Sequence, residues 1–226
     1  MYGMQKIKRV AKILQILSKY GFDEVISRSN IDRLIPDSVL LWNKHSKRIF
    51  EQDFNIRIRM AIEELGPTFI KLGQMLSNRA DIIPEDLRME LVKLQDNVPV
   101  EPMDLRAKLA ESLDIDVDAH FSHIDTEPIA AASIAQVYRA VRLDGKEVII
   151  KVKRSGISDV VHADLGFLKD LIKLLREKYE VIYKMNLYEI VQSFGKSLVN
   201  ELSFTNELNY IDKFRRNFKG NQEIYV

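Results

Sequence analysis

Residues 130–152 carry the clearest signal of secondary structure and read Ala-Ala-Ala-Ser-Ile-Ala-Gln-Val-Tyr-Arg-Ala-Val-Arg-Leu-Asp-Gly-Lys-Glu-Val-Ile-Ile-Lys-Val. They contain two runs rich in β-branched residues, 134–143 and 147–152, which flank Asp144-Gly145. An Asp-Gly pair between two such runs is typical of a tight hairpin turn, because glycine tolerates the positive φ that the turn requires. The sequence therefore predicts a β-hairpin.

Helical periodicity surrounds the hairpin on both sides. The helical pattern before the hairpin is interrupted by residues that commonly end helices: Gly66-Pro67, Pro84, Pro99 and Pro102. We therefore expect an α+β protein, in which a small antiparallel sheet with helices is preceded by an all-helical extension. The helices are expected over 5–20, 46–64, 68–78, 85–94, 103–113, 157–178 and 187–218.

The composition limits the classes of function. The 226 residues include 34 lysines and arginines against 33 acidic residues, so no global charge attracts the chain to nucleic acid. The absence of cysteine excludes disulfides, thiolate catalysis and cysteine-ligated metal sites. The surroundings of His120 and His123 fit a turn or a helix end, so we expect no metal site there. No apolar run is long enough to span a membrane, and the expected location is the cytoplasm, with the inner face of a membrane as a peripheral site.

The N-terminal segment 5–20 combines apolar residues at helical spacing with several lysines and an arginine. Such a basic amphipathic helix can lie on an anionic membrane surface. Packing of the apolar face against the rest of the protein is the more common outcome. Both interpretations stay open for this segment.

The order of features around the hairpin is that of a protein-kinase N-lobe. The small residues 130–133 come first, Lys151 lies on the second strand of the hairpin, and a long helix with acidic residues follows. In this architecture, small residues let backbone N–H groups approach the nucleotide phosphates, a strand lysine neutralises them, and a helical glutamate orients the lysine. Alanines in place of glycines lose freedom at positive φ, so we expect the phosphates to be held differently.

A second informative stretch lies in the helical extension. It reads Leu-Gly-Pro-Thr-Phe-Ile-Lys-Leu-Gly-Gln at 65–74 and continues through Leu-Ser-Asn-Arg-Ala-Asp at 76–81 to Leu-Gln-Asp-Asn-Val-Pro at 94–99. This stretch resembles the KxGQ signature of the UbiB (aarF domain-containing, coenzyme Q-type) atypical kinase-like family. The alanine-rich run, Lys151 and a downstream acidic motif follow in the family's order, so the resemblance covers the chain from about Arg59 onward and points to the N-terminal portion of such a protein.

The resemblance implies roles for individual residues. Lys71 and Gln74 would lie over the nucleotide pocket and block the groove in which a protein substrate would sit. Glu201 would begin the family's ExD motif and pair with Lys71, while Glu207 would pair with Lys151. The implied nucleotide-binding residues are Ala130, Ala131, Ala132, Ser133, Lys151 and Glu207, and the implied gating residues are Lys71, Gln74 and Glu201.

Ser203 departs from the family pattern, which has an aspartate at this position of the ExD motif. A hydroxyl group forms no ion pair and binds Mg²⁺ less strongly than a carboxylate does. We therefore expect a weaker clamp on Lys71 than in the family.

Two segments imitate kinase motifs of the catalytic lobe. Asp164-Leu165-Gly166 resembles the metal-binding Asp-Phe-Gly, and Asp212 with Asn217 has the spacing of the catalytic loop. Both lie in helical stretches and in the wrong order, so we expect them to be solvated helix residues. The chain is therefore expected to contain no catalytic or metal-binding residue, with ATP or ADP and Mg²⁺ bound by the complete protein.

The sequence predicts two domains. Residues 1–123 are expected to form the helical extension with the KxGQ motif, and residues 124–226 the kinase-like N-lobe. The chain stops at Glu223-Ile224-Tyr225-Val226, which resembles the start of another strand. A C-lobe is therefore expected to be absent or incomplete.

Together these features predict the nucleotide-binding part of a UbiB-like atypical kinase or ATPase that supports ubiquinone or other isoprenoid-lipid metabolism, inactive by itself. The expected partners are a nucleotide and an isoprenoid lipid or quinone precursor, with no nucleic acid. The alternative is a non-catalytic helical module that binds a lipid or a partner protein at the membrane surface. An ordinary protein kinase would instead have a glycine-rich loop and an open substrate groove.

Overall fold

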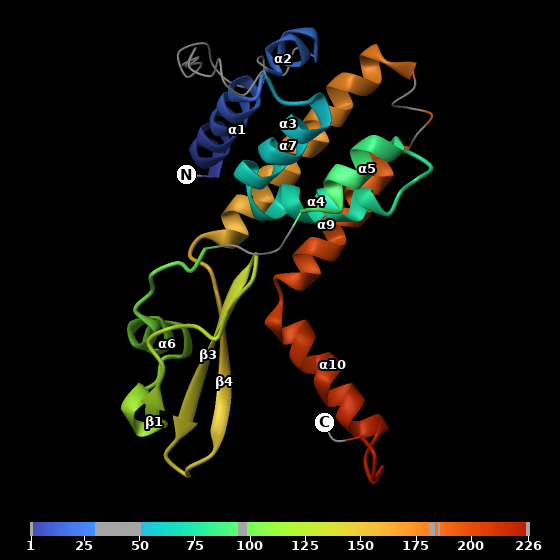
Figure 1. The fold of residues 1–226 in the computed structure, drawn as a ribbon. Helices are drawn as coiled ribbons and strands as arrows, with labels where there is room; N and C mark the ends of the chain where they lie inside the picture. Colours follow the sequence, from blue (N-terminus) through green and yellow to red (C-terminus); the bar gives the residue numbers. More distant parts are fainter. Residues whose placement is uncertain (1, 30–50, 95–98, 181–183, 185, 225–226) are drawn as a thin grey trace. The chain divides into compact units, whose positions relative to one another are not determined.

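The structure, a computed structural model, describes residues 2–29, 51–94, 99–180, 184 and 186–224 (Figure 1). The chain forms two compact units, one of Met1–Val92 with Ser158–Val226 and one of Lys93–Ile157. This division differs from the single boundary expected near Ile124, because the helix before the sheet packs on the sheet and the helices after it join the N-terminal helices. Each unit is described by itself.

The smaller unit, Lys93–Ile157, is built on a 4-stranded antiparallel sheet. β3 is central, because it pairs with β4 on one side and with both β1 and β2 on the other. Gly145 takes a φ of +79° in the turn between β3 and β4, which confirms the predicted hairpin. The strands are β1 (Phe121–Ile124), β2 (Ala130–Ala131), β3 (Ala135–Arg142) and β4 (Glu147–Lys153).

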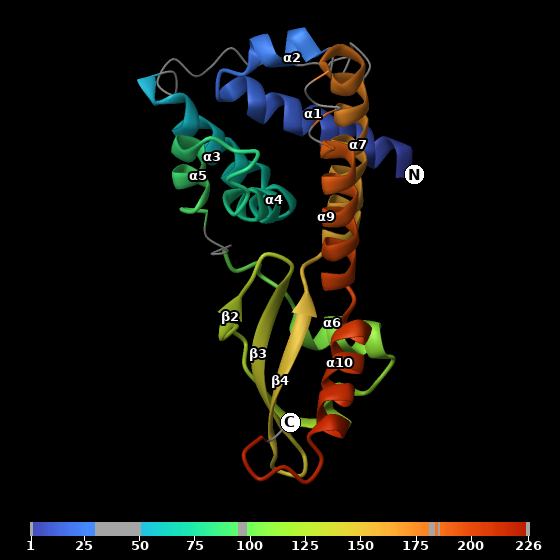
Figure 2. The same cartoon turned by 90° about the vertical axis from the view of Figure 1, so that its right-hand side faces the viewer.

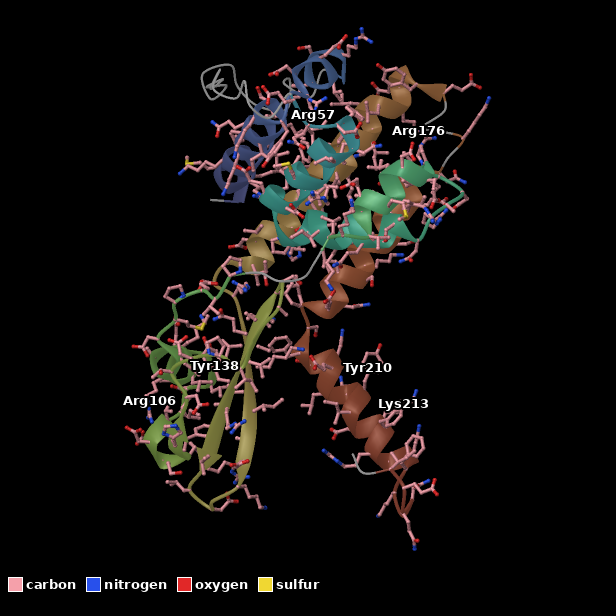
Figure 3. All side chains as sticks on the ribbon, viewed as in Figure 1. Arg57, Arg106, Tyr138, Arg176, Tyr210 and Lys213 are labelled. Atoms are coloured by element: carbon pink, nitrogen blue, oxygen red, sulfur yellow. The ribbon has the colours of Figure 1, made fainter. Side chains whose placement is uncertain are left out.

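One face of this sheet carries the core of the smaller unit. The helix α6 (Leu105–Leu113) packs on this face, where Leu105 and Leu109 are buried together with Tyr138 and Ala140 of β3. Figure 3 shows Tyr138 on the α6 side of the strand. The sheet and α6 therefore form two layers around one apolar core.

The opposite face of the sheet carries Lys151. Successive side chains of a strand point to opposite faces, so Lys151 projects away from the core that Val152 enters. Ile149, two positions earlier on β4, is 68% exposed. In the register of the hairpin, Val137 lies opposite Lys151. The strand lysine thus stands on an exposed, partly apolar sheet surface.

The larger unit is helical. Its longest helix, α7, begins at the unit boundary, and Figure 2 shows α7 and α9 side by side. The two helices approach closely at Gly195, where an added Cβ would lie 3.4 Å from the side chain of Leu165. The helices are α1 (Tyr2–Lys19), α2 (Asp23–Ser29), α3 (Phe54–Leu65), α4 (Pro67–Ser77), α5 (Glu85–Leu91), α7 (Ile157–Lys178), α9 (Leu187–Glu201) and α10 (Phe204–Asn217).

The helix α1 confirms the helix expected over 5–20 and shows where its apolar face goes. Val10, Ile13, Leu14 and Ile16 are all buried, with Ile13 completely so. These residues are the apolar stripe that a membrane-bound helix would insert into lipid. In this structure the stripe packs within the protein. No helix in the described part of the chain is long and apolar enough to cross a membrane.

Other expected helices are found with different limits. The helix expected over 46–64 begins at Phe54, and residues 46–50 lie outside the described part of the chain. The single helix expected over 187–218 is wrong, because α9 ends at Glu201 and α10 begins at Phe204. At the C-terminal end, residues 223–224 are not in a strand, and residues 225–226 lie outside the described part.

Candidate functional site

Two of the residues that are expected to form the gate, Lys71 and Glu201, lie together in the larger unit. Lys71 is on α4 and Glu201 is the last residue of α9, and the Lys71 Nζ lies 3.7 Å from a Glu201 carboxylate oxygen. This contact joins the two residues for which the family resemblance implies a pairing, and their role as a gate stays a prediction. Gln74 lies one turn farther along α4 and is partly exposed.

Local sequence orients α4 for this contact. Gly66, with a φ of +93°, ends α3, and Pro67 occupies the first turn of α4, where its missing N–H group costs nothing. Phe69, Ile70 and Gly73 are buried. Burial of that face leaves Lys71 partly exposed on another side of the helix.

The Lys71–Glu201 contact is an ion pair of modest strength. The side chains of Lys71 and Glu201 are 26% and 44% exposed, and 3.7 Å exceeds the length of a good hydrogen bond. Partly exposed pairs of this kind contribute roughly 0–1 kcal/mol to stability. The contact therefore contributes little to the stability of the fold. What it does is hold the Lys71 side chain near Glu201.

Ser203 has a structural role that the sequence comparison with the ExD motif did not reveal. It is the N-cap of α10, and its side-chain oxygen accepts a hydrogen bond from the Asn206 N–H at 3.3 Å. The break between α9 and α10 therefore coincides with the position at which the family has an aspartate. Serine and aspartate are both good N-cap residues.

This observation gives a prediction with a matched control. Ser203→Ala should lower the free energy of unfolding by about 1 kcal/mol, because the cap is lost. Ser203→Asp should leave stability near the wild-type value, since aspartate caps equally well and its charge suits a helix N-terminus. Urea unfolding followed by circular dichroism measures both variants. Equal losses for Ala and Asp would contradict the capping role.

Lys151 and Glu207 are both exposed, as the nucleotide-binding interpretation requires of them. Lys151 belongs to the smaller unit, and Glu207, in the first turn of α10, belongs to the larger one. Their pairing therefore stays a prediction.

The alanine run is partly strand. Ala130 and Ala131 form β2, opposite Val137 and Gln136 of β3. The chain then turns back at once, because the N–H of Ala132 donates to the carbonyl of Ala135 at 2.8 Å. Ser133, next in the turn, is buried. The expected small-residue connection between two strands is present, and it is tight.

Two residues that the sequence analysis did not single out fix this turn. The Arg154 Nε donates to the Ala132 carbonyl at 2.9 Å, and its Nη1 donates to the Pro99 carbonyl at 2.9 Å. Gln136 is completely buried, and its amide exchanges hydrogen bonds of 2.6 and 3.0 Å with the backbone of Glu101. The position of Gln136 inside a β-branched run was the signal that could have indicated a buried, hydrogen-bonded side chain. These bonds tie the turn to the segment before α6.

Asp164 corrects an expectation. It was expected to be a solvated helix residue, but its side chain is 0% exposed. The Arg9 Nε donates to Asp164 Oδ1 at 2.6 Å and the Arg9 Nη2 donates to Asp164 Oδ2 at 2.9 Å, so the pair is bidentate. Burial raises the pKa of Asp164, and Arg9 opposes that effect. Asp212, by contrast, lies on α10, in which no residue is buried.

Metal ligands do not gather anywhere in the described part of the chain: no group of three or more histidine or acidic side chains is placed to hold an ion. His120 ends a short 3₁₀ turn, and His123 lies on β1 beside Asp125, 3.0 Å away.

Comparison with known proteins gives a family match for more than half of the chain. Residues 93–226 match the ABC1 atypical kinase-like domain. A protein named probable protein kinase UbiB from Azotobacter vinelandii is 35% identical over 228 residues, covering 95% of this chain. A protein of the same name from Aeromonas salmonicida is 37% identical over 227 residues, covering 98% of this chain.

These matches cover only part of the relatives. The chain spans 42% of the Azotobacter protein and 41% of the Aeromonas protein. A solved structure shows a Mycobacterium tuberculosis protein, Rv3197, in complex with erythromycin. The alignment covers 71% of this chain and 41% of the Rv3197 chain, with 25% identity and a TM-score of 0.48.

Proposed function

Because the chain belongs to the ABC1 atypical kinase-like family, we propose that it supplies the nucleotide-binding lobe and the gate of a UbiB-like atypical kinase or ATPase. The observation that carries this proposal is the contact between Lys71 and Glu201, two residues that the family resemblance selected independently. In this proposal residues 1–123 act as the regulatory extension and residues 124–226 as the kinase-like lobe.

The residues of the smaller unit fit a phosphate-bearing ligand. Lys151 offers a cation on an exposed sheet surface, and residues 130–133 themselves carry only small side chains. Lys151 would neutralise nucleotide phosphates, and the residues 130–133 would approach them through the backbone. A bound Mg²⁺ ion would shield further phosphate charge. Ser203, which belongs to the larger unit, would be a weaker ligand for Mg²⁺ than the family's aspartate.

The residues of the larger unit fit a gate. In the proposed arrangement, Lys71 and Gln74 cover the substrate groove and Glu201 holds Lys71 in place. A covered groove excludes a peptide but admits water or a small lipid headgroup, so ATPase activity or lipid-directed activity is favoured over protein phosphorylation. We propose an isoprenoid lipid or quinone precursor as the partner, and support of ubiquinone or related lipid metabolism as the role.

The decisive experiment is magnesium-dependent binding of ADP and ATP measured by calorimetry. The titration is carried out with this chain and with a longer protein, called the extended protein, which has the length of the relatives. Saturable binding by the extended protein supports the proposal. A folded extended protein that binds neither nucleotide contradicts it and favours the non-catalytic lipid-binding module.

The gate gives a separate prediction. In the extended protein, Lys71→Ala should increase phosphorylation of myelin basic protein, because the ion pair that closes the groove is lost. A pair worth up to about 1 kcal/mol corresponds to a change of about two- to five-fold. Incorporation of radiolabelled phosphate measures the effect.

Two variants test this explanation. Glu201→Gln removes the same ion pair and should give the same increase. Lys196→Ala removes an exposed lysine of α9 outside the pair and should leave the rate unchanged. An increase with all three variants would contradict the gate, because Lys196 takes no part in the Lys71–Glu201 pair.

A further inference from the structure

The buried pair of Arg9 and Asp164 joins three segments that are distant in the sequence. Arg9 lies on α1 and Asp164, 155 positions away, lies on α7. The Arg9 Nη2 also donates a hydrogen bond of 2.6 Å to the Leu65 carbonyl, 56 positions away at the end of α3. One guanidinium group on α1 therefore binds both α3 and α7 through directional hydrogen bonds.

The Leu65 carbonyl belongs to the α3–α4 junction, residues 65–67, which sets the direction of α4. Carbonyls in the last turn of a helix lack partners within the helix, and Arg9 satisfies this one. Gly66 follows with a φ of +93°, and its own carbonyl accepts the N–H groups of Phe69 and Ile70, both at 3.0 Å. A change at Leu65 would therefore be transmitted directly to the first turn of α4.

Because the pair is buried, we expect it to contribute more to the orientation of the helices than to the stability of the fold. The side chains of Arg9 and Asp164 are 13% and 0% exposed, so both lost much of their hydration on folding. Apolar residues of similar volume often stabilise a protein as well as a buried ion pair does. What an apolar pair lacks is the fixed geometry of a bidentate guanidinium.

We propose that Arg9 and Asp164 are positioning residues that hold the α3–α4 junction so that Lys71 meets Glu201. This inference rests on the proposed gate. Lys71 lies one turn beyond Pro67, and its contact with Glu201 is long at 3.7 Å. A small reorientation of α4 is enough to break such a contact. Arg9 and Asp164 act through Lys71 and touch neither substrate nor nucleotide.

The test replaces the pair with apolar residues, Arg9→Met together with Asp164→Leu, so that no buried charge is left without a partner. Thermal unfolding of this chain should change much less than with Arg9→Ala, because only the hydrogen bond to the Leu65 carbonyl is lost and no buried charge is left unpaired. Hydrogen exchange in residues 66–77 should become about ten-fold faster, because the junction is no longer held. Unchanged exchange in α4 would overturn the proposal. If the double variant fails to fold, Arg9→Lys, which keeps the charge but loses the bidentate fork, is measured in the same way.

A mutant cycle in the extended protein separates positioning from a general structural effect. The apolar pair should raise phosphorylation of myelin basic protein by about two- to five-fold, as Lys71→Ala does. In a Lys71→Ala background the apolar pair should add nothing further. Additive effects would overturn the proposed route through Lys71. If Lys71→Ala alone has no effect while the exchange in α4 accelerates, the proposed gate fails and the positioning of α4 by Arg9 stands.

Discussion

Replacement of Arg9 by alanine is expected to lower the free energy of unfolding by about 3–5 kcal/mol, the usual cost of removing one partner of a buried ion pair. Asp164 would be left completely buried without its guanidinium partner, and the Leu65 carbonyl would lose a hydrogen bond of 2.6 Å. Since stability is typically only about 5–15 kcal/mol, this single change would remove much of it. Chemical denaturation followed by circular dichroism measures the loss.

The loss should depend on pH in a defined direction. Burial already raises the pKa of Asp164 above its unfolded value, and removal of Arg9 raises this pKa further. A carboxyl group whose pKa is raised in the folded state favours folding at low pH and loses that advantage as the pH rises through the folded pKa. The deficit of Arg9→Ala should therefore shrink as the pH falls from 7 toward about 4. A deficit that grows at acid pH would contradict this account.

The chain provides a matched control for the burial argument. Arg79 binds Asp81 in the same bidentate way, with distances of 2.8 and 2.7 Å, but on the surface. Arg79→Ala should leave the unfolding midpoint close to wild type, because water replaces the lost partner. Equal losses for Arg9→Ala and Arg79→Ala would show that burial of Asp164 is not the cause.

Asp164 also shows where prediction from sequence stops. Its triplet lies in a helix, as the sequence predicted, but its burial could not be predicted from the helix alone. Its partner, Arg9, is 155 positions away and belongs to a segment that was predicted only as a basic amphipathic helix. Which lysine or arginine of an amphipathic helix turns inward depends on the acid that another helix presents to it. That information is tertiary.

Local features were predictable for local reasons. The hairpin follows from Asp144-Gly145 between two β-branched runs, and the α3–α4 junction follows from Gly66-Pro67. The break at Ser203 was missed because apolar spacing continues across it, although serine is a strong N-cap signal. The division into units was not predictable from position in the chain, because α7 leaves the sheet and joins helices that precede it in the sequence.

The family resemblance contributed what periodicity could not. Lys71 and Glu201 each look like ordinary exposed helix residues, and nothing in their local sequence connects them. Only the order of motifs selected them as a pair, and the structure places them in contact. Glu207, the partner expected for Lys151, lies in the other unit, and this pairing stays a prediction.

The second large effect is expected at Lys151. In the extended protein, Lys151→Ala should weaken binding of ATP and ADP by about ten- to one-hundred-fold, because one charge-assisted hydrogen bond to a phosphate is worth about 1.5–3 kcal/mol. Stability should hardly change, since the Lys151 side chain projects from the exposed face of the sheet and the core is formed on the other face. Calorimetric titration with Mg²⁺ present measures the affinities.

Lys146→Ala is the appropriate control for this prediction. Lys146 lies in the turn of the same hairpin, with its side chain 73% exposed and 3.8 Å from Asp144. Its removal changes the net charge of the smaller unit as much as Lys151→Ala does, but on a residue outside the proposed phosphate site. If only Lys151→Ala reduces the affinity, the loss is specific to the strand position and not to charge in general. If both variants bind nucleotide as the wild type does, Lys151 is not the phosphate-binding lysine, and the kinase-like interpretation of the sheet loses its central residue.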